Sequence, residues 1–347
     1  MKALLLLLLV GSASAENVWQ HAIEQGSPDA DQSRYDSDLK SGDEQTMLAL
    51  SGSISRATQA QILHGAIAFY RSAAQAKPNE PEVYYKIGRV LYSFYFEACD
   101  SDPLSMQRPS LQCQRSGFDT VHAKEIIEAW DRFEQLAPLD PRVSVERGHP
   151  GSVDFDLIFH RAILHTKFGD RKNLDAAIRD YERILHRTDR PGDIVLSNLA
   201  ETYMMLGRLD DSIEMYRRAL LGNANVETAY GLAVALDRDE RGDQAADLVI
   251  AQGLAAMKEF TEKVNRGTTF FVPPGEENYY YALAFEAFGQ RDNALVAWQR
   301  YQVSEAAKVH PEYAPRVKQH IDRMVRERGR GEVTGPLPDT PWLKYIP

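Results

Sequence analysis

The sequence predicts an all-α protein, a solenoid of about six helix–turn–helix units, and three observations support this fold class. Apolar residues such as Leu196, Leu199 and Tyr203 recur with the period of one helix face. Small residues such as Ala200 stand where two helices must approach closely. A glycine, Gly207 in this unit, ends the first helix and permits a tight turn into the second.

The turn glycines repeat along the chain and define its period. Gly169, Gly207, Gly242 and Gly289 are separated by 38, 35 and 47 residues. Self-similarity with a period of about 20–50 residues is the signature of solenoids and related arrays. The longest interval predicts an insertion at residues 258–278, which contains the run TTFFVPPG.

The second helix of the best-defined unit carries Ser212, Tyr216 and Ala219 on one face. Together with Ala200 and Gly207, this pattern resembles the tetratricopeptide repeat (TPR), a helical hairpin of about 34 residues. Further copies of the pattern occupy residues 66–91, 155–185, 226–252 and 276–301. The resemblance implies a right-handed solenoid whose first helices line a concave groove that binds other proteins.

The N-terminus has the pattern of a secretory signal peptide. Lys2 is followed by an apolar run over residues 4–10 and by small residues, with Ala13 and Ala15 at the positions that a signal peptidase reads. The run is too short to span a bilayer. We expect cleavage after Ala15, and a soluble product in a periplasm or outside the cell.

The rest of the chain divides into five predicted parts. They are a short helix and polar linker at 16–45, two units at 46–140 with an insertion at 98–122, further units at 141–310, a capping helix at 311–328 and an extended tail at 329–347. Residues 26–44 read as a polar loop or linker. Three interior prolines exclude a helix in the tail.

Composition narrows the choice of partners and chemistry. The net charge of −10 makes nucleic acid an unfavourable partner. The only cysteines, Cys99 and Cys113, lie in the polar insertion, where a structural disulfide is favoured over a metal or redox site because there is no Cys-x-x-Cys. Phosphate-binding, nucleophile-elbow and zinc-protease motifs are missing from the sequence, so we expect no catalytic residues, no metal and no cofactor.

Helix register predicts which side chains face the groove. They lie between the core positions of each first helix and mix charged, aromatic and methionine side chains, which suits a helix or an extended peptide. The alternative is that some of them pack against neighbouring loops. The predicted groove residues are Glu82, Tyr85, Arg89, Tyr92, Asp156, Phe159, Ile163, Lys167, Ile194, Ser197, Glu201, Met204, Met205, Tyr279, Leu283 and Glu286.

The tail offers a second candidate contact, because Trp342 and Tyr345 are large apolar groups in a segment that cannot bury them alone. We expect them either to contact a partner or to dock back on the last helices of the chain.

The signal peptide and the repeats together favour an exported TPR scaffold or adaptor that binds proteins, as in assembly of a pilus, secretion or motility complex. A periplasmic receptor for a peptide, glycan or other ligand is the alternative. An enzyme is disfavoured because no segment is long enough for a catalytic domain.

Overall fold

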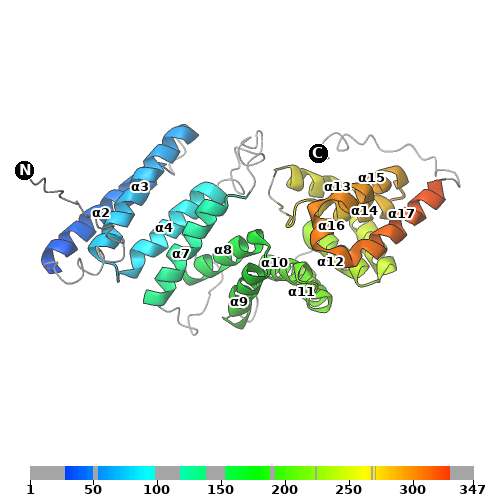
Figure 1. Ribbon diagram of the computed structural model, residues 1–347, viewed down its shortest axis with the longest axis horizontal. Helices are drawn as coiled ribbons and strands as arrows, with labels where there is room; N and C mark the ends of the chain where they lie inside the picture. The colour runs from blue at the N-terminus through cyan, green and yellow to red at the C-terminus, as the bar shows by residue number, and fades with distance from the viewer. Residues whose placement is uncertain are drawn as a thin grey trace, which may run out of the picture. The chain divides into compact units, whose positions relative to one another are not determined.

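A computed structural model describes residues 28–49, 54–97, 118–137, 153–187, 192–222, 225–266, 269 and 271–328. Every regular element within these residues is a helix (Figure 1). Consecutive helices pair in helix–turn–helix units, which confirms the predicted all-α class and is consistent with a TPR-type solenoid. None of the described helices is long and apolar enough to cross a membrane.

The chain forms two compact units. The first contains residues 1–90 and 128–138, and the second contains residues 91–127 and 139–347. The described elements of the first unit are α2 (Pro28–Ala49), α3 (Arg56–Ala76), most of α4 (Pro81–Tyr92) and the C-terminal half of α7 (Thr120–Leu136).

Residues 26–44, expected to be a polar linker, instead belong largely to the helix α2, which packs against α3. The buried positions of α2 include Tyr35, Gly42 and Ala49, spaced by seven residues. Two of these three residues are small, so the buried stripe adds little to the hydrophobicity of the segment. A Cβ atom on Gly42 would lie 2.5 Å from the ring of Tyr70, so the glycine permits the close approach of α3.

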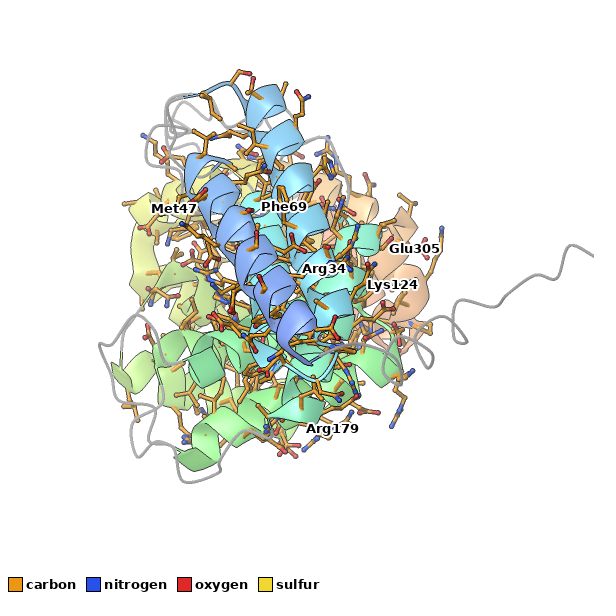
Figure 2. All side chains as sticks on the ribbon, turned by 90° about the vertical axis from the view of Figure 1, so that its left-hand side faces the viewer. Arg34, Met47, Phe69, Lys124, Arg179 and Glu305 are labelled. Atoms are coloured by element: carbon orange, nitrogen blue, oxygen red, sulfur yellow. The ribbon has the colours of Figure 1, made fainter. Side chains whose placement is uncertain are left out.

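Polar contacts also join α2 and α3. The Nη2 atom of Arg34 donates a hydrogen bond to the Oγ atom of Ser72 over 2.8 Å. Figure 2 shows Arg34 and Met47 along α2, with Phe69 on the adjacent α3. The hydroxyl of Tyr70 donates to the Oδ1 atom of Asp43. Helix α2 is therefore the first member of a helical pair.

The pairing of α4 with α7 in the first unit depends on a small residue, as the repeat pattern predicts. A Cβ atom on Gly88 would lie 2.3 Å from the Nε1 atom of the fully buried Trp130. The same indole donates to the carbonyl of Tyr85 over 3.3 Å. Tyr85 also packs against Phe133, with 5.7 Å between ring centroids.

Within its described residues, the second unit contains four further helical pairs and a C-terminal cap. The described elements after the π-helical turn Ser93–Glu97 and the N-terminal half of α7 are α8 (Val153–Phe168), α9 (Arg171–Arg187), α10 (Asp193–Met205), α11 (Leu209–Gly222), α12 (Val226–Arg238), α13 (Gly242–Arg266), α14 (Glu277–Ala287), α15 (Arg291–Val303), α16 (Glu305–Val309), a 3-10 turn (Pro311–Tyr313) and α17 (Ala314–Arg328). Helix α17 packs against α15.

The turn glycines have the conformation that their role requires at three of four positions. Gly169, Gly207 and Gly289 have φ angles of +73°, +73° and +71°, in the left-handed region that favours glycine. The fourth assignment is wrong, because Glu240 has the positive φ angle there, at 61°. Gly242 instead begins α13, where a Cβ atom would lie 2.3 Å from the Nη2 atom of Arg316.

The insertion expected at residues 258–278 is partly helical. Helix α13 kinks at Gly253, whose φ of 77° and ψ of 169° are not helical, and then continues to Arg266. Met257 and Phe260, beyond the kink, are 0% and 1% exposed. The kink thus turns the end of α13 so that part of the insertion joins the hydrophobic core of the second unit.

Several predictions concern residues that the structure does not describe. They are the signal peptide at 1–15, the pair Cys99 and Cys113, and the tail residues Trp342 and Tyr345.

Candidate functional site

A cavity of about 390 Å³ opens on the first helices of the second unit. Residues from six helices line it, together with two from the loop between α13 (Gly242–Arg266) and α14 (Glu277–Ala287). The described lining residues are Thr166 of α8, Asp193, Ile194, Ser197, Asn198 and Glu201 of α10, Tyr216 of α11, Asn225, Glu227 and Thr228 at the start of α12, Phe260 and Lys263 of α13, Thr269, Phe271, and Tyr280 of α14.

Glu201 is held by two tyrosine hydroxyls at the cavity. Its Oε2 atom accepts hydrogen bonds from the hydroxyls of Tyr216 over 2.5 Å and Tyr280 over 2.9 Å. Its Oε1 atom is buried and has no hydrogen-bond partner among the described residues. Burial raises the pKa of the Glu201 carboxyl, and the two tyrosine hydroxyls only partly oppose that shift.

A glycine positions one of these tyrosines. A Cβ atom on Gly231 of α12 would lie 2.5 Å from the Tyr216 hydroxyl oxygen. A larger residue there would displace the ring of Tyr216 and with it the hydrogen bond to Glu201. The repeat pattern requires Tyr216 for packing, and the structure shows that its hydroxyl also holds Glu201 in place.

A second carboxylate, that of Glu227, lines the same cavity. Its Oε1 atom pairs with the Nζ atom of Lys263 over 2.7 Å, and Lys263 also pairs with Glu259 over 3.0 Å. The Oε2 atom of Glu227 is buried without a hydrogen-bond partner in the described part of the chain. Two carboxylates of one cavity therefore each keep an oxygen with unused acceptor capacity.

The aromatic wall of the cavity is formed by Phe260, Phe271 and Tyr280. The rings of Phe260 and Tyr280 stack, with 5.8 Å between centroids and 11° between planes. Phe271 meets Tyr280 edge-on at 5.0 Å. Aromatic faces of this kind bind apolar groups and cations.

The rim near α10 and α12 is polar with one exposed apolar side chain. Asn225 caps α12 by accepting from the amide of Thr228 over 2.8 Å, and the hydroxyls of Ser197 and Thr228 lie 2.7 Å apart. Ile194 is 55% exposed beside them. An exposed isoleucine at the edge of a partly apolar cavity is a candidate contact for a bound chain.

The predicted groove residues of α10 fall into two groups. Ser197 and Glu201 line the cavity, as does Ile194. Met204 and Met205 are 0% and 8% exposed and belong to the buried core. The register therefore separates cavity residues from core residues within a single helix.

The predicted groove residues of α14 are covered. Tyr279 is 0% and Leu283 8% exposed, and the Tyr279 hydroxyl donates to Asp237 over 2.8 Å. Glu286 accepts from Trp298 and contacts His320 and Arg323 of α17. Tyr279 and Glu286 are thus engaged within the chain and Leu283 belongs to the core, although Leu283 and Glu286 also border a second cavity of about 280 Å³.

The remaining predicted groove residues lie apart from the cavity. Glu82 pairs with Lys86 over 3.2 Å in the first unit, which also contains Tyr85 and Arg89. In the second unit, Tyr92 is 3% exposed and stacks on His160 at 4.3 Å.

On α8, Phe159 is 9% exposed and lies 6.3 Å from the ring of Tyr181. Ile163 and Lys167 are partly exposed. Asp156 belongs to α8, and its side chain lies outside the described set.

Other cavity residues were missed by the sequence reasoning. Glu227, Lys263, Phe271 and Tyr280 reach the cavity from the start of α12, the end of α13, the insertion and α14. The one signal that points to Phe271 is the Phe-Phe pair of the run TTFFVPPG. No metal-binding cluster of three or more His, Cys, Asp or Glu side chains occurs among residues that the structure describes.

A second polar centre lies beneath α17. Asp237 is 0% exposed and accepts from the hydroxyl of Tyr279 over 2.8 Å and from the Nη2 atom of Arg316 over 2.6 Å. The ring nitrogens of His320 lie 3.0 Å from Asp237 and 2.9 Å from Glu286. Arg323 also donates to Glu286.

The pKa values of this centre follow from its contacts. Burial would raise the pKa of Asp237, but hydrogen bonds and charge attraction from His320 and Arg316 outweigh it and lower the pKa. Burial would lower the pKa of His320, but hydrogen bonds to Asp237 and Glu286 raise it. Both partners are thereby held in their charged forms.

A buried ion pair lies close to this centre. Arg238 donates to Glu276 over 2.5 Å, and the two side chains are 1% and 2% exposed. The guanidinium also lies over the rings of Tyr279 at 4.7 Å and Tyr313 at 4.4 Å. Burial raises the pKa of Glu276 to about 7, against the opposing charge of Arg238.

Comparisons with known proteins find a likeness among solved structures only. No family model matches the sequence, and no curated protein matches it. Among solved structures, the crystal structure of the TPR domain of P58(IPK) is similar over 85% of this chain and 98% of that chain, with 12% identity and a TM-score of 0.20. The assignment of the fold rests on the helical hairpins of the chain itself.

Proposed function

We propose that this protein is an exported TPR-type scaffold that binds segments of partner proteins, in the assembly of a cell-envelope complex. The cavity is the main observation that supports this proposal, because the first helices of successive hairpins all contribute residues to it. Its mixture of aromatic, hydroxyl and carboxylate groups suits a protein segment, which presents both apolar side chains and hydrogen-bonding groups.

The exposed Ile194 at the rim supports the same proposal. Ile194 is 55% exposed beside the cavity, and covering its apolar surface would make the free energy of partner binding more favourable. The signal-like N-terminus supports export, and the acidic chain disfavours nucleic acid as the partner.

Site-specific photocrosslinking tests this function. A photoreactive amino acid replaces Ile194 in the full chain, expressed in cells, where the mature protein is expected to begin at Glu16. We expect crosslinks to a discrete partner polypeptide, identified by mass spectrometry.

A matched control is available at Ile250 of α13, which is 52% exposed but does not line the cavity. Crosslinks of equal yield from positions 194 and 250, or from neither, would count against binding at this face. A small molecule retained by the purified protein in native mass spectrometry, with no polypeptide crosslinked, would instead favour a solute receptor.

A further inference from the structure

The cavity carries more information about its ligand than a general protein-binding surface does. Asp193, Glu201 and Glu227 contribute three carboxylates, and Lys263 is the single Lys or Arg among the described lining residues. Lys263 is already paired with Glu227 and Glu259. The cavity therefore favours a ligand with positive charge.

The unpartnered oxygens specify hydrogen-bond donors on that ligand. The Oε1 atom of Glu201 and the Oε2 atom of Glu227 are both buried without partners among the described residues. A buried acceptor without a partner is unfavourable, and such a group calls for a bound donor. The terminal torsion of a glutamate side chain is soft, so a small rotation can turn the unpaired oxygen toward a ligand.

The aromatic wall restricts the shape of the donor group. Phe260, Phe271 and Tyr280 line the same cavity as the two carboxylates. A planar guanidinium stacks on aromatic rings while its N–H groups donate within its own plane. An ammonium has no plane to stack and presents a compact, strongly hydrated charge.

The size of the cavity limits how much of the ligand enters. Its volume of about 390 Å³ lies at the lower end of the roughly 300–1,000 Å³ found for ligand pockets. One long side chain fits this space, whereas the backbone of the partner segment would lie at the rim, near Ile194 and Ser197. A large glycan is excluded from the interior by the same volume.

We propose that this cavity binds an arginine side chain of the partner segment. The guanidinium donates to Glu201 and Glu227 and stacks on the wall of Phe260, Phe271 and Tyr280. This assignment rests on the proposed function and specifies the residue that the site recognises.

Selection from a phage-displayed library of random peptides tests the assignment. We expect the full-length wild-type protein to enrich peptides with arginine at one fixed position. In a selected peptide, replacing that arginine with citrulline, which is neutral and nearly isosteric, should weaken binding by at least about ten-fold, and lysine should restore only part of it.

Glu201→Gln is the decisive variant, because the amide oxygen of glutamine still accepts from Tyr216 and Tyr280. We expect it to lose the preference for arginine over citrulline. Glu182→Gln is the matched control: Glu182 also accepts a tyrosine hydroxyl, that of Tyr203 over 2.8 Å, and lies outside the cavity. Glu227→Gln provides a second reading if Glu201→Gln fails to fold.

The possible failures are distinguishable. The arginine assignment would be overturned if the selected peptides showed no preference for arginine. It would also be overturned if Glu201→Gln and Glu227→Gln both preferred arginine over citrulline as strongly as the wild-type protein does. Either result would leave peptide binding intact. Selection of no peptide by the folded wild-type protein would overturn the assignment together with the proposed function.

Discussion

Two carboxylate centres of the second unit have opposite hydrogen-bonding states. In the cavity, Glu201 and Glu227 each keep one buried oxygen without a partner among the described residues. Beneath α17, both oxygens of Asp237 and both oxygens of Glu286 are engaged. The first centre thus keeps acceptor oxygens for the proposed ligand, whereas the acceptors of the second centre are all used by donors within the chain.

In the second centre, the basic side chains that pair with the carboxylates come from the chain itself. Arg316, His320 and Arg323 all belong to α17, which packs against α15 (Figure 1). Helix α17 therefore does for Asp237 and Glu286 what a bound basic segment is proposed to do for Glu201 and Glu227. Three predictions test this contrast.

The largest expected effect comes from Asp237→Ala. This change leaves Arg316 and His320 without their buried partner, and removal of one member of a buried ion pair costs about 3–5 kcal/mol. Urea unfolding measures the loss. Asp210→Ala is the control, because Asp210 is 93% exposed and its pair with Arg241 spans 3.7 Å, so its removal should leave stability unchanged within error. Equal stability of both variants would show that the α17 centre is not structural.

Two Glu→Gln variants, one in each centre, should have smaller effects on stability that differ in direction. Glu286→Gln weakens charged hydrogen bonds to His320 and Arg323 and should cost about 1–3 kcal/mol. Glu201→Gln removes a buried charge that has no counterpart on Oε1, so stability should stay level or rise.

The pair is compared by urea unfolding at about pH 8, where the Glu201 carboxyl is more fully ionised. The sign follows from its raised pKa: an acid with a raised folded-state pKa loses its stabilising contribution as pH rises through that pKa. A loss in Glu201→Gln as large as that in Glu286→Gln would mean that both centres are structural.

The smallest expected effect is the pH dependence of wild-type stability. His320 has a raised pKa, so its contribution is complete below its ordinary value of 6.5 and is lost as pH rises through the folded value. Glu276 behaves in the same sense, with its contribution lost as pH rises through about 7. Asp237 and Glu286 have lowered pKa values, so their contributions are lost on the acid side.

Stability should therefore decline as pH rises through about 7 and above, as measured by urea unfolding at several pH values. His320 faces Asp237 of α12, Glu286 of α14 and Trp298 of α15, and Arg323 lies beside it on α17. His320→Gln should flatten this decline. An unchanged slope in that variant would assign the decline to other groups.

Much of the fold could be predicted from the sequence because its signals are local. Helix periodicity and the glycines at positions 169, 207 and 289 depend on a few neighbouring residues, and the structure places those glycines in the left-handed region. Helix α2 was missed because its buried stripe includes small residues, Gly42 and Ala49, which periodicity counts overlook. The turn at Gly242 was misplaced by two residues because Glu240 takes the positive φ angle.

The candidate site could be predicted only in part. The register of α10 identified Ser197 and Glu201, but the same reasoning on α14 selected Tyr279 and Glu286, which contacts within the chain occupy. Nothing local distinguishes a first helix that stays open from one that a later helix covers.

The sequence by itself determined the helical hairpins, their approximate number and the positions of most turns, because 3.6-residue periodicity and backbone stereochemistry are short-range properties. Only the tertiary structure decided which carboxylates are satisfied. Glu201 meets Tyr280 across 79 residues of chain, and Asp237 meets His320 across 83. Whether a buried oxygen finds a donor depends on packing between residues far apart in the sequence. That packing is why the carboxylates of the cavity and those beneath α17 differ in their hydrogen bonding.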